Sequence, residues 1–442
     1  MIQQIYKNLA KESMEYAIKN GADNVRISIN SGSNSVFEYR DKNLDKLQQS
    51  SENRMEIELF MDGRYGSYSS NRMDKKNLFK FILSAIESTR CLDKDAARTL
   101  PEPSRYYKGE MFGLDTCDPD FENVSMDKKL ELARKQTDEI YGIDQRIVSI
   151  TTEYSDGDSF LYIISSNGFE GETAHSQYSL YSSVSMKDEG DARPNSYWHE
   201  TALFLNKLTN SGIGKKAYEK TLQKLGQKKI ASNRYPMLLD NTQSSRLLSP
   251  LISAMNGYSL QQKNSFLIDK LGEKIISEKV SITDDPHIKG AFGARMFDDE
   301  GVATQKRSII EKGILKTYFI DTYISKKMDM QPTISSPSIV NFDLGTRTHE
   351  QILANIDKGI WVTGFNGGNS NSSTGDFSFG IEGFLIENGK ISTPVNEMNI
   401  TGNILSLWNN VVEIGNDPRL NSSRRVPSIL FDNVDFSGSQ DL

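Results

Sequence analysis

Two histidine–glutamate pairs are the positions of this chain that come nearest to a metal site. His199-Glu200 and His349-Glu350 each begin like the HExxH helix of a zinc peptidase. That motif needs a second histidine one turn later, so that both imidazoles lie on one face of the helix and bind the same ion. Leucine stands at both of those positions, Leu203 and Leu353. We therefore expect structural or solvated histidines and predict no metal site in this chain.

The other common catalytic signatures are absent from the sequence. There is no GxSxG nucleophile elbow, no Walker A phosphate loop and no GxGxxG dinucleotide fingerprint. Cys91 and Cys117 lie 26 residues apart without a CxxC pair, which disfavours a zinc knuckle. The acidic clusters 284–285 and 298–300 lie beside Gly or Pro, and we expect them to be solvated turns. We predict no catalytic residue and no cofactor belonging to this chain.

The remaining chemical signal is a polar stretch near the end of the chain. Most of residues 363–380 are Gly, Ser, Thr, Asn or Asp, and an apolar run at 384–386 and an Asn388-Gly389 hairpin signal follow. A flexible linker would not end in a tight hairpin. The pattern predicts a polar loop held by sheet on both sides, which could present backbone N–H and C=O groups to an extended partner.

Two interpretations of this loop remain open. It is either an ordinary surface loop, or a recognition loop lining a groove in which an extended peptide pairs with a strand edge. In the second case its polar side chains would supply hydrogen bonds and its glycines would allow close backbone approach. The predicted substrate-binding residues are Gly367, Gly368, Asn369, Thr374, Gly375, Asp376 and Ser378.

The elements that must position this loop follow from periodicity and turn signals. Apolar residues at helical spacing, with capping or stop signals, predict helices at 2–19, 75–88, 127–141, 215–225 and 246–256. Alternating or buried runs predict strands at 25–29, 55–61, 64–69, 147–152, 160–164, 178–186 and 236–239. Two similar hairpins are expected at 310–315 and 386–391, and an irregular segment at 100–120.

This order of elements predicts an α+β protein of two domains. Residues 1–228 form an N-terminal α/β domain, which could contain two similar halves. Residues 229–442 form a strand-rich C-terminal domain, and its many turns indicate a curved or barrel-like sheet. The polar and basic stretch 226–235 marks the boundary.

Composition narrows the class of protein. The chain has 442 residues, of which 37% are hydrophobic and 25% charged, as in ordinary globular proteins. Its net charge of −7 and its lack of a long Lys/Arg run disfavour direct nucleic-acid binding. The amphipathic N-terminus is not a signal peptide, and no run approaches the roughly 18–20 apolar residues of a membrane span. With only two cysteines, a cytoplasmic location is expected.

The second half of the sequence resembles the TldD/PmbA family, also called modulators of DNA gyrase. The resemblance lies in ordered blocks: LLD at 238–240, NSFL at 264–267, DKLGE at 269–273, DDEGVATQ at 298–305, IEKGILK at 310–316, TGDFS at 374–378, IENG at 386–389, TGN at 401–403 and GND at 415–417. The N-terminal half is similar more loosely, at 21–23 and 62–66.

This family has two branches, and the resemblance implies which one the chain is similar to. The TldD-like branch carries an HExxxH zinc helix and a C-terminal cysteine, whereas the PmbA (TldE) branch lacks both. Counting back from Ser265, Leu248 and Ser253 stand where the histidines would be, and Ser249 where the glutamate would be. The tail from 418 to 442 holds no cysteine. The chain therefore resembles PmbA.

The resemblance implies a non-catalytic subunit that helps to bind unfolded peptides for proteolysis. Zinc is then expected only in a TldD-like zinc peptidase partner, and a homodimer of the isolated chain is also compatible. Two alternatives stay open. One is a stand-alone peptide-binding protein, and the other is a peptidase with an unrecognised site that recruits metal at His287 or His349.

Overall fold

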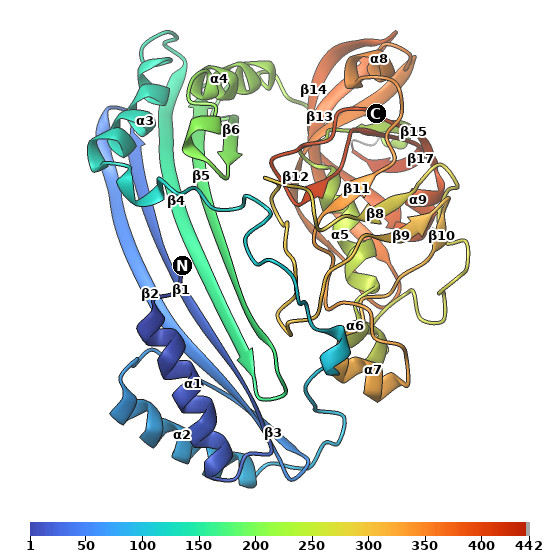
Figure 1. Cartoon of the computed structure of the whole chain (residues 1–442). Coiled ribbons are helices and arrows are strands. Elements are labelled where there is room, and N and C mark those ends of the chain that lie inside the picture. The colour runs from blue at the N-terminus through green and yellow to red at the C-terminus, as the bar shows by residue number, and fades with distance from the viewer. Residues whose placement is uncertain (439–442) are drawn as a thin grey trace.

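A long antiparallel sheet forms the first half of the molecule in the computed structural model, which describes residues 1–438 (Figure 1). Residues 439–442, the end of the predicted C-terminal domain, lie outside the described residues. The first elements are α1 Gln4–Lys19, β1 Asn24–Arg40, β2 Asn43–Met61, β3 Arg64–Ser70 and α2 Lys75–Arg90. The next are α3 Met126–Asp138, β4 Ile147–Ser165, β5 Glu170–Met186, β6 Asn195–Ala202 and α4 Ile213–Gln223.

These ten elements repeat one order, helix–strand–strand–strand–helix, twice. The sheet order β3-β2-β1-β4-β5-β6 is symmetric about the β1–β4 pair, so the two similar halves that the sequence left open as a possibility meet at the centre of the sheet. The buried residues of β1 are spaced by even numbers and share one face: Val25, Ile27, Ile29 and Phe37. Both helix pairs pack on this face, α1 and α2 at one end and α3 and α4 at the other.

The strands are much longer than the sequence predicted. The strand expected at 25–29 extends to Arg40, and those expected at 147–152 and 160–164 are one strand, β4. The polar residues 153–159 resemble a loop in sequence, but they pair with β1 on one side and with β5 on the other. Tertiary pairing therefore overrides the weak local preference of these residues.

A closed ring of strands forms the core of the second half. The ring runs β14-β13-β12-β7-β17 and closes through a β14–β17 pairing. Its members are β7 Asn233–Leu239, β12 Lys358–Ser370, β13 Asp376–Glu387, β14 Lys390–Asn403 and β17 Ile429–Ser437, and β15 Val411–Ile414 adds to β17. The expected α+β class and barrel-like C-terminal sheet are confirmed.

A second sheet and five helices complete this half. The sheet order is β10-β9-β8-β11-β16, with β8 Ile282–Asp284, β9 Arg307–Glu311, β10 Ile314–Leu315, β11 Val340–Phe342 and β16 Arg424–Arg425. The helices are α5 Ser244–Ala254, α6 Gly257–Gln261, α7 Thr322–Met328, α8 His349–Leu353 and α9 Ile404–Asn409. Both expected hairpins are present, and their turn residues, Lys312-Gly313 and Asn388-Gly389, have positive φ.

Two residues of the acidic clusters, Asp284 and Asp298, are not solvated as the sequence suggested, whereas their neighbour Asp299 is exposed in a turn. Asp284 and Asp298 are each only 2% exposed. The Asp284 carboxylate accepts backbone N–H bonds from Ser338 (2.8 Å) and Ile339 (3.0 Å), and Asp298 accepts them from Glu300 and Val302. These carboxylates stabilise turns by satisfying buried backbone donors, which an exposed turn would leave to water.

The irregular segment expected at 100–120 connects the two halves of the molecule. Tyr106 forms a β-bridge with Val302, and the Arg105 guanidinium donates to the Thr333 carbonyl (3.0 Å). Because these bonds join segments about two hundred residues apart in sequence, they fix one half against the other.

A buried ionic group joins the two halves more directly. Arg26 on β1 donates to both oxygens of Glu58, and its Nη1 lies 3.9 Å from Oε1 of Glu300 in the second half. The other Glu300 oxygen accepts from the Thr322 backbone N–H (3.1 Å) and hydroxyl (2.9 Å). Burial, and then the nearby Asp298 charge, raise the pKa of Glu300 to about 7, although Arg26 opposes the shift.

The raised pKa of Glu300 makes the free energy of unfolding depend on pH. Between pH 4.5 and 7 the folded chain keeps a proton on Glu300 that the unfolded chain loses, so the free energy of unfolding falls as pH rises through this window. The shift corresponds to about 3 kcal/mol. Glu300→Gln should flatten the dependence between pH 5 and 8 in urea unfolding, whereas Asp299→Asn, at an exposed neighbour, should not. Equal pH profiles for wild type and Glu300→Gln would contradict the assignment.

Candidate functional site

The polar stretch 363–380 is a β-hairpin and not the loop that the sequence suggested. β12 and β13 pair through Gly368↔Phe379, Asn369↔Ser378 and Ser370↔Phe377, which leaves only residues 371–375 as a turn. The ladder shifts register near Val362 and again between Phe365 and Gly368. Burial alternates along β13, which explains the pairing: Phe377, Phe379 and Ile381 are buried, and the residues between them face outward.

Three of the predicted site residues hold the hairpin tip. The Asp376 carboxylate accepts from the Asn403 side-chain amide (3.0 Å) and from the Thr374 hydroxyl (2.8 Å), and these bonds, in that order, lower the pKa of Asp376. The same Asn403 amide donates to the Thr374 carbonyl (2.8 Å), and Gly375 is buried beneath them. Both carboxylate oxygens of Asp376 therefore already have partners within the tip.

A cavity of about 430 Å³ lies between this hairpin and α5. Of the seven predicted residues only Gly368 and Asn369 line it, while the other five do not: Gly367, Thr374, Gly375, Asp376 and Ser378. The opposite wall is a face of α5 that was not predicted from the sequence: Arg246, Ser249 and Ser253 are its polar residues, and Pro250 lies among them. Their spacing of three or four residues, opposite an apolar face, was the signal that could have found them.

Arg246 connects the two walls of the cavity. Its guanidinium lies 5.0 Å from the Phe379 ring centroid, and Nη2 donates to the Gly368 carbonyl (3.1 Å). Pro250 has no N–H, so the Arg246 carbonyl lacks the helical donor it would otherwise have. The cavity therefore offers backbone acceptors from the helix and from the strand.

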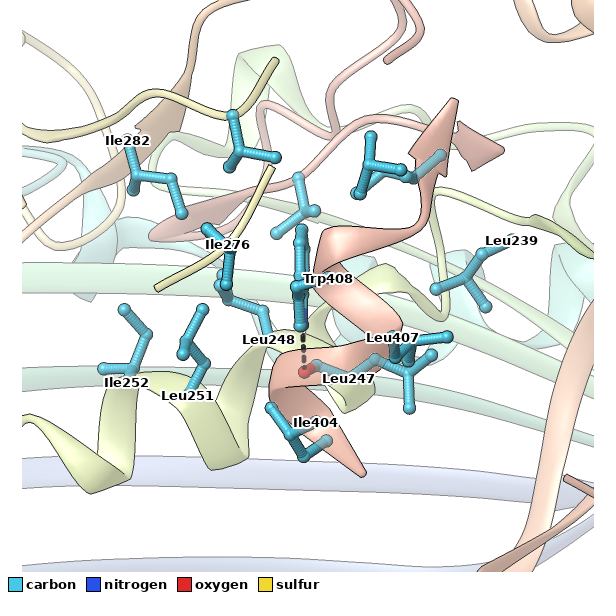
Figure 2. Close-up of a cluster of buried hydrophobic side chains, with 14 of the residues drawn as sticks. Leu239, Leu247, Leu248, Leu251, Ile252, Ile276, Ile282, Ile404, Leu407 and Trp408 are labelled. Atoms are coloured by element: carbon cyan, nitrogen blue, oxygen red, sulfur yellow. Dashed lines mark hydrogen bonds between the residues drawn. The ribbon is translucent and has the colours of Figure 1, made fainter. Parts of the chain in front are cut away.

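The positions that correspond to the family's zinc helix do not fit a metal ion. Leu248 is fully buried in the core beside Trp408, whose indole N–H donates to the Leu247 carbonyl (3.1 Å; Figure 2). Ser249 donates to the Ser245 carbonyl (2.8 Å), and Ser253 is an exposed hydroxyl at the cavity. An aliphatic side chain and two neutral hydroxyls do not supply the imidazole, thiolate or carboxylate ligands that zinc requires.

The histidines do not gather into a metal site. His287 bonds the Thr304 hydroxyl (3.0 Å) and His349 bonds the Ser428 hydroxyl (3.0 Å). Within residues 1–438, no three His, Cys, Asp or Glu side chains lie close enough together to hold a metal ion. Nor does any helix in that range combine the length and apolarity needed to cross a membrane.

Neighbouring glycines on β12 give a matched test of the hairpin. Gly367 and Gly368 have φ of 87° and 90°, a region that other residues adopt at a cost. A Cβ on Gly368 would also lie 2.1 Å from the Ser378 carbonyl oxygen, whereas one on Gly367 would meet nothing within 4 Å. Gly367→Ala should cost about 1–2 kcal/mol of unfolding free energy, and Gly368→Ala clearly more. Equal losses in urea unfolding would contradict this hairpin geometry.

Comparison with protein families matches most of the chain. The family model described as the PmbA/TldA metallopeptidase central domain matches residues 119–225, and the one described as the C-terminal domain matches residues 232–438. Metalloprotease PmbA of Escherichia coli O157:H7 is 26% identical over 94% of this chain and 93% of its own length. A metalloprotease TldD homologue of Buchnera aphidicola is 30% identical over 47% of this chain and 46% of its own length.

Solved structures agree with this match. A Bacteroides thetaiotaomicron crystal structure, described as a candidate modulator of DNA gyrase, has a TM-score of 0.97 and 54% identity over 99% of this chain and 100% of its own. TldE from Thermococcus kodakarensis shares the fold, with a TM-score of 0.86 at 21% identity over 98% of this chain and 100% of its own. The chain belongs to the PmbA/TldD metallopeptidase family.

Proposed function

We propose that this chain is a PmbA/TldE-like, non-catalytic subunit of a TldD-type zinc peptidase system, and that it binds unfolded peptide substrates. The observation that carries the proposal is the α5–hairpin cavity. It lies on the helix where the family's zinc residues would stand, yet its walls offer hydroxyls, an arginine and backbone groups. Such a surface suits binding of a chain better than hydrolysis.

The edge of β12 gives the peptide a place to pair. β12 pairs with β7 only at Ile360, Trp361 and Val362. Beyond Val362, within the described chain, no strand pairs with the β12 edge opposite β13. An extended peptide added there would pair through its backbone, which gives affinity with little sequence preference. Asn369 would then bind the peptide, while Thr374, Gly375 and Asp376 hold the tip.

Catalysis would belong to the partner. The proposed partner is a TldD-like subunit with an HExxxH zinc helix, and this chain would complete the substrate channel and hold the peptide extended. The TldD homologue among the relatives supports the existence of such proteins in the family.

Purification of the tagged chain from its native host tests the subunit role. We expect co-purification of a relative that carries HExxxH, identified by mass spectrometry, together with zinc measured by elemental analysis. Recovery of the chain alone and free of metal would overturn the subunit role and favour an independent binding protein. Metal-dependent cleavage by the isolated chain would overturn the non-catalytic assignment.

Filling the cavity tests peptide binding. Ser253 is exposed and lines the cavity, so Ser253→Trp should lower affinity for a fluorescein-labelled unstructured peptide at least about tenfold, or ~1.4 kcal/mol, without lowering the melting temperature. Ser84→Trp makes the same change at an exposed position of α2 and should leave affinity unchanged. Fluorescence anisotropy measures both. Unchanged binding by Ser253→Trp would place the peptide elsewhere.

A further inference from the structure

A second polar cavity lies between the two halves of the molecule, at the end of the long sheet that carries α4. It consists of two hollows of about 360 and 460 Å³, which share His199 and Thr242 in their walls. The first is bordered by α4, β6 and β12, and the second by β6 and the segment 419–424. We call the joined hollows the cationic cavity.

Positive side chains lie in the walls of this cavity or beside it: Lys220 and Lys224 line the first hollow, Arg419 lines the second, and Lys216 packs on Trp198 of the first. Lys216, Lys220 and Lys224 follow one another at intervals of four residues, so they lie on one face of α4 and its C-cap. Like charges at this spacing repel one another, so the arrangement carries a cost unless something compensates for it. Lys224 is compensated, because it donates to Glu382 (2.6 Å) and to the Asn195 carbonyl (2.8 Å).

The other cations gather around the indole ring of Trp198. Lys216, Lys220 and Arg419 lie 3.5, 5.5 and 4.9 Å from the centroid of the Trp198 ring. Within the described residues, none of the three forms an ion pair with a carboxylate at or below 4.0 Å. Burial lowers the pKa of Lys220, and Lys224 and Lys216 lower it further against the opposing charge of Asp240. The carboxylates that act on Lys216 and Lys220, Glu200 and Asp240 among them, lie beyond ion-pair distance, so a bound anion would further offset the desolvation of these cations.

Unsatisfied polar atoms line the same cavity. The Gln227 side-chain amide nitrogen and the Thr363 hydroxyl in the first hollow are buried without a hydrogen-bond partner, as is Arg424 Nη1 in the second. Two of these three atoms can only donate. Buried donors without acceptors are uncommon in folded proteins, and a bound acceptor would satisfy them.

We propose that the cationic cavity binds a carboxylate, and that its occupant is the C-terminal carboxylate of the bound peptide. Glu382 neutralises Lys224, and Glu200 lies against Trp198, accepting its indole N–H (2.7 Å), so these carboxylates reduce the positive charge of the cavity. Arg193, Lys220, Arg419 and Arg424 also line it, so a positive charge remains for an anion to compensate.

The strand edge proposed for the peptide runs directly into this cavity. Residues 363–366 of β12 line the cationic cavity, and residues 368–370 line the α5–hairpin cavity. A peptide extended along β12 would therefore place one end among Lys220, Trp198 and Arg419. Identification of the carboxylate as a peptide terminus rests on the proposed function, whereas the anion site itself does not.

The first experiment tests the anion site without a peptide. The indole N–H resonance of Trp198, assigned by its loss in Trp198→Phe, is followed by NMR during titration. N-acetylglycine should shift it saturably, and the neutral N-acetylglycinamide should not. Lys220→Met and Arg419→Met should each weaken this binding at least about fivefold, since a hydrogen bond to a charged group is lost. Lys215→Met, at an exposed position of α4, should not.

Two outcomes of this titration would overturn the site. No saturable shift with N-acetylglycine would exclude a carboxylate site in the cavity. Tighter binding of inorganic phosphate than of N-acetylglycine would replace the carboxylate with a phosphate as ligand. Thermal melts of each variant confirm that it is folded before its affinity is interpreted.

The second experiment compares one labelled peptide as free acid and as C-terminal amide. The acid should bind at least about tenfold more tightly, and Lys220→Met should abolish the difference. Equal affinities would overturn the terminus assignment while peptide binding stands. If neither peptide binds although N-acetylglycine does, the proposed function and the terminus assignment fail together, and the anion site stands alone.

Discussion

The packing of α5 on the barrel core is the constraint on which the candidate site depends. Leu247, Leu248 and Leu251 are fully buried, and the Trp408 indole bonds the Leu247 carbonyl at the start of the helix. A helix with one apolar face has one favourable rotation against a core. That rotation turns Arg246 and Ser253 toward the β12–β13 hairpin. The same packing makes position 248 part of the core, so an imidazole there would lose hydrophobic burial and gain an unsatisfied nitrogen.

The long sheet of the first half imposes a second constraint. All four of its helices cover one face. The other face, toward the barrel half, carries polar side chains beside a small apolar cluster that includes Ile163 and Phe297. Polar groups at such an interface need partners or solvent-filled space. Some of these groups find partners in the buried ionic contact among Arg26, Glu58 and Glu300. Others line the cationic cavity, which water or a ligand can enter.

Sequence reasoning succeeded where the signal was local. The turn at Asn388-Gly389 and the helices expected at 75–88 and 215–225 were predicted, because each depends on residues close together in sequence. It failed where partners distant in sequence decide the outcome. The middle of β4 is polar and reads as a loop, yet strands on both sides hold it in the sheet. Asp298 reads as a turn acid, yet it is buried because the backbone of its own turn needs acceptors.

For the site, three features could be predicted from the residues alone: a polar, glycine-rich stretch, a helix without zinc ligands, and the family to which those patterns belong. The identity of the residue at each position is enough for these conclusions, because the ability to bind a metal ion depends on side-chain type. Three contacts of the folded chain could not be predicted: Gly368 accepts from Arg246, Asp376 bonds within the hairpin tip, and lysines of α4 lie with Arg419 around Trp198. The first two contacts join segments of the barrel half that are distant in sequence, and the third joins the two halves, so their geometry arises only when those segments pack.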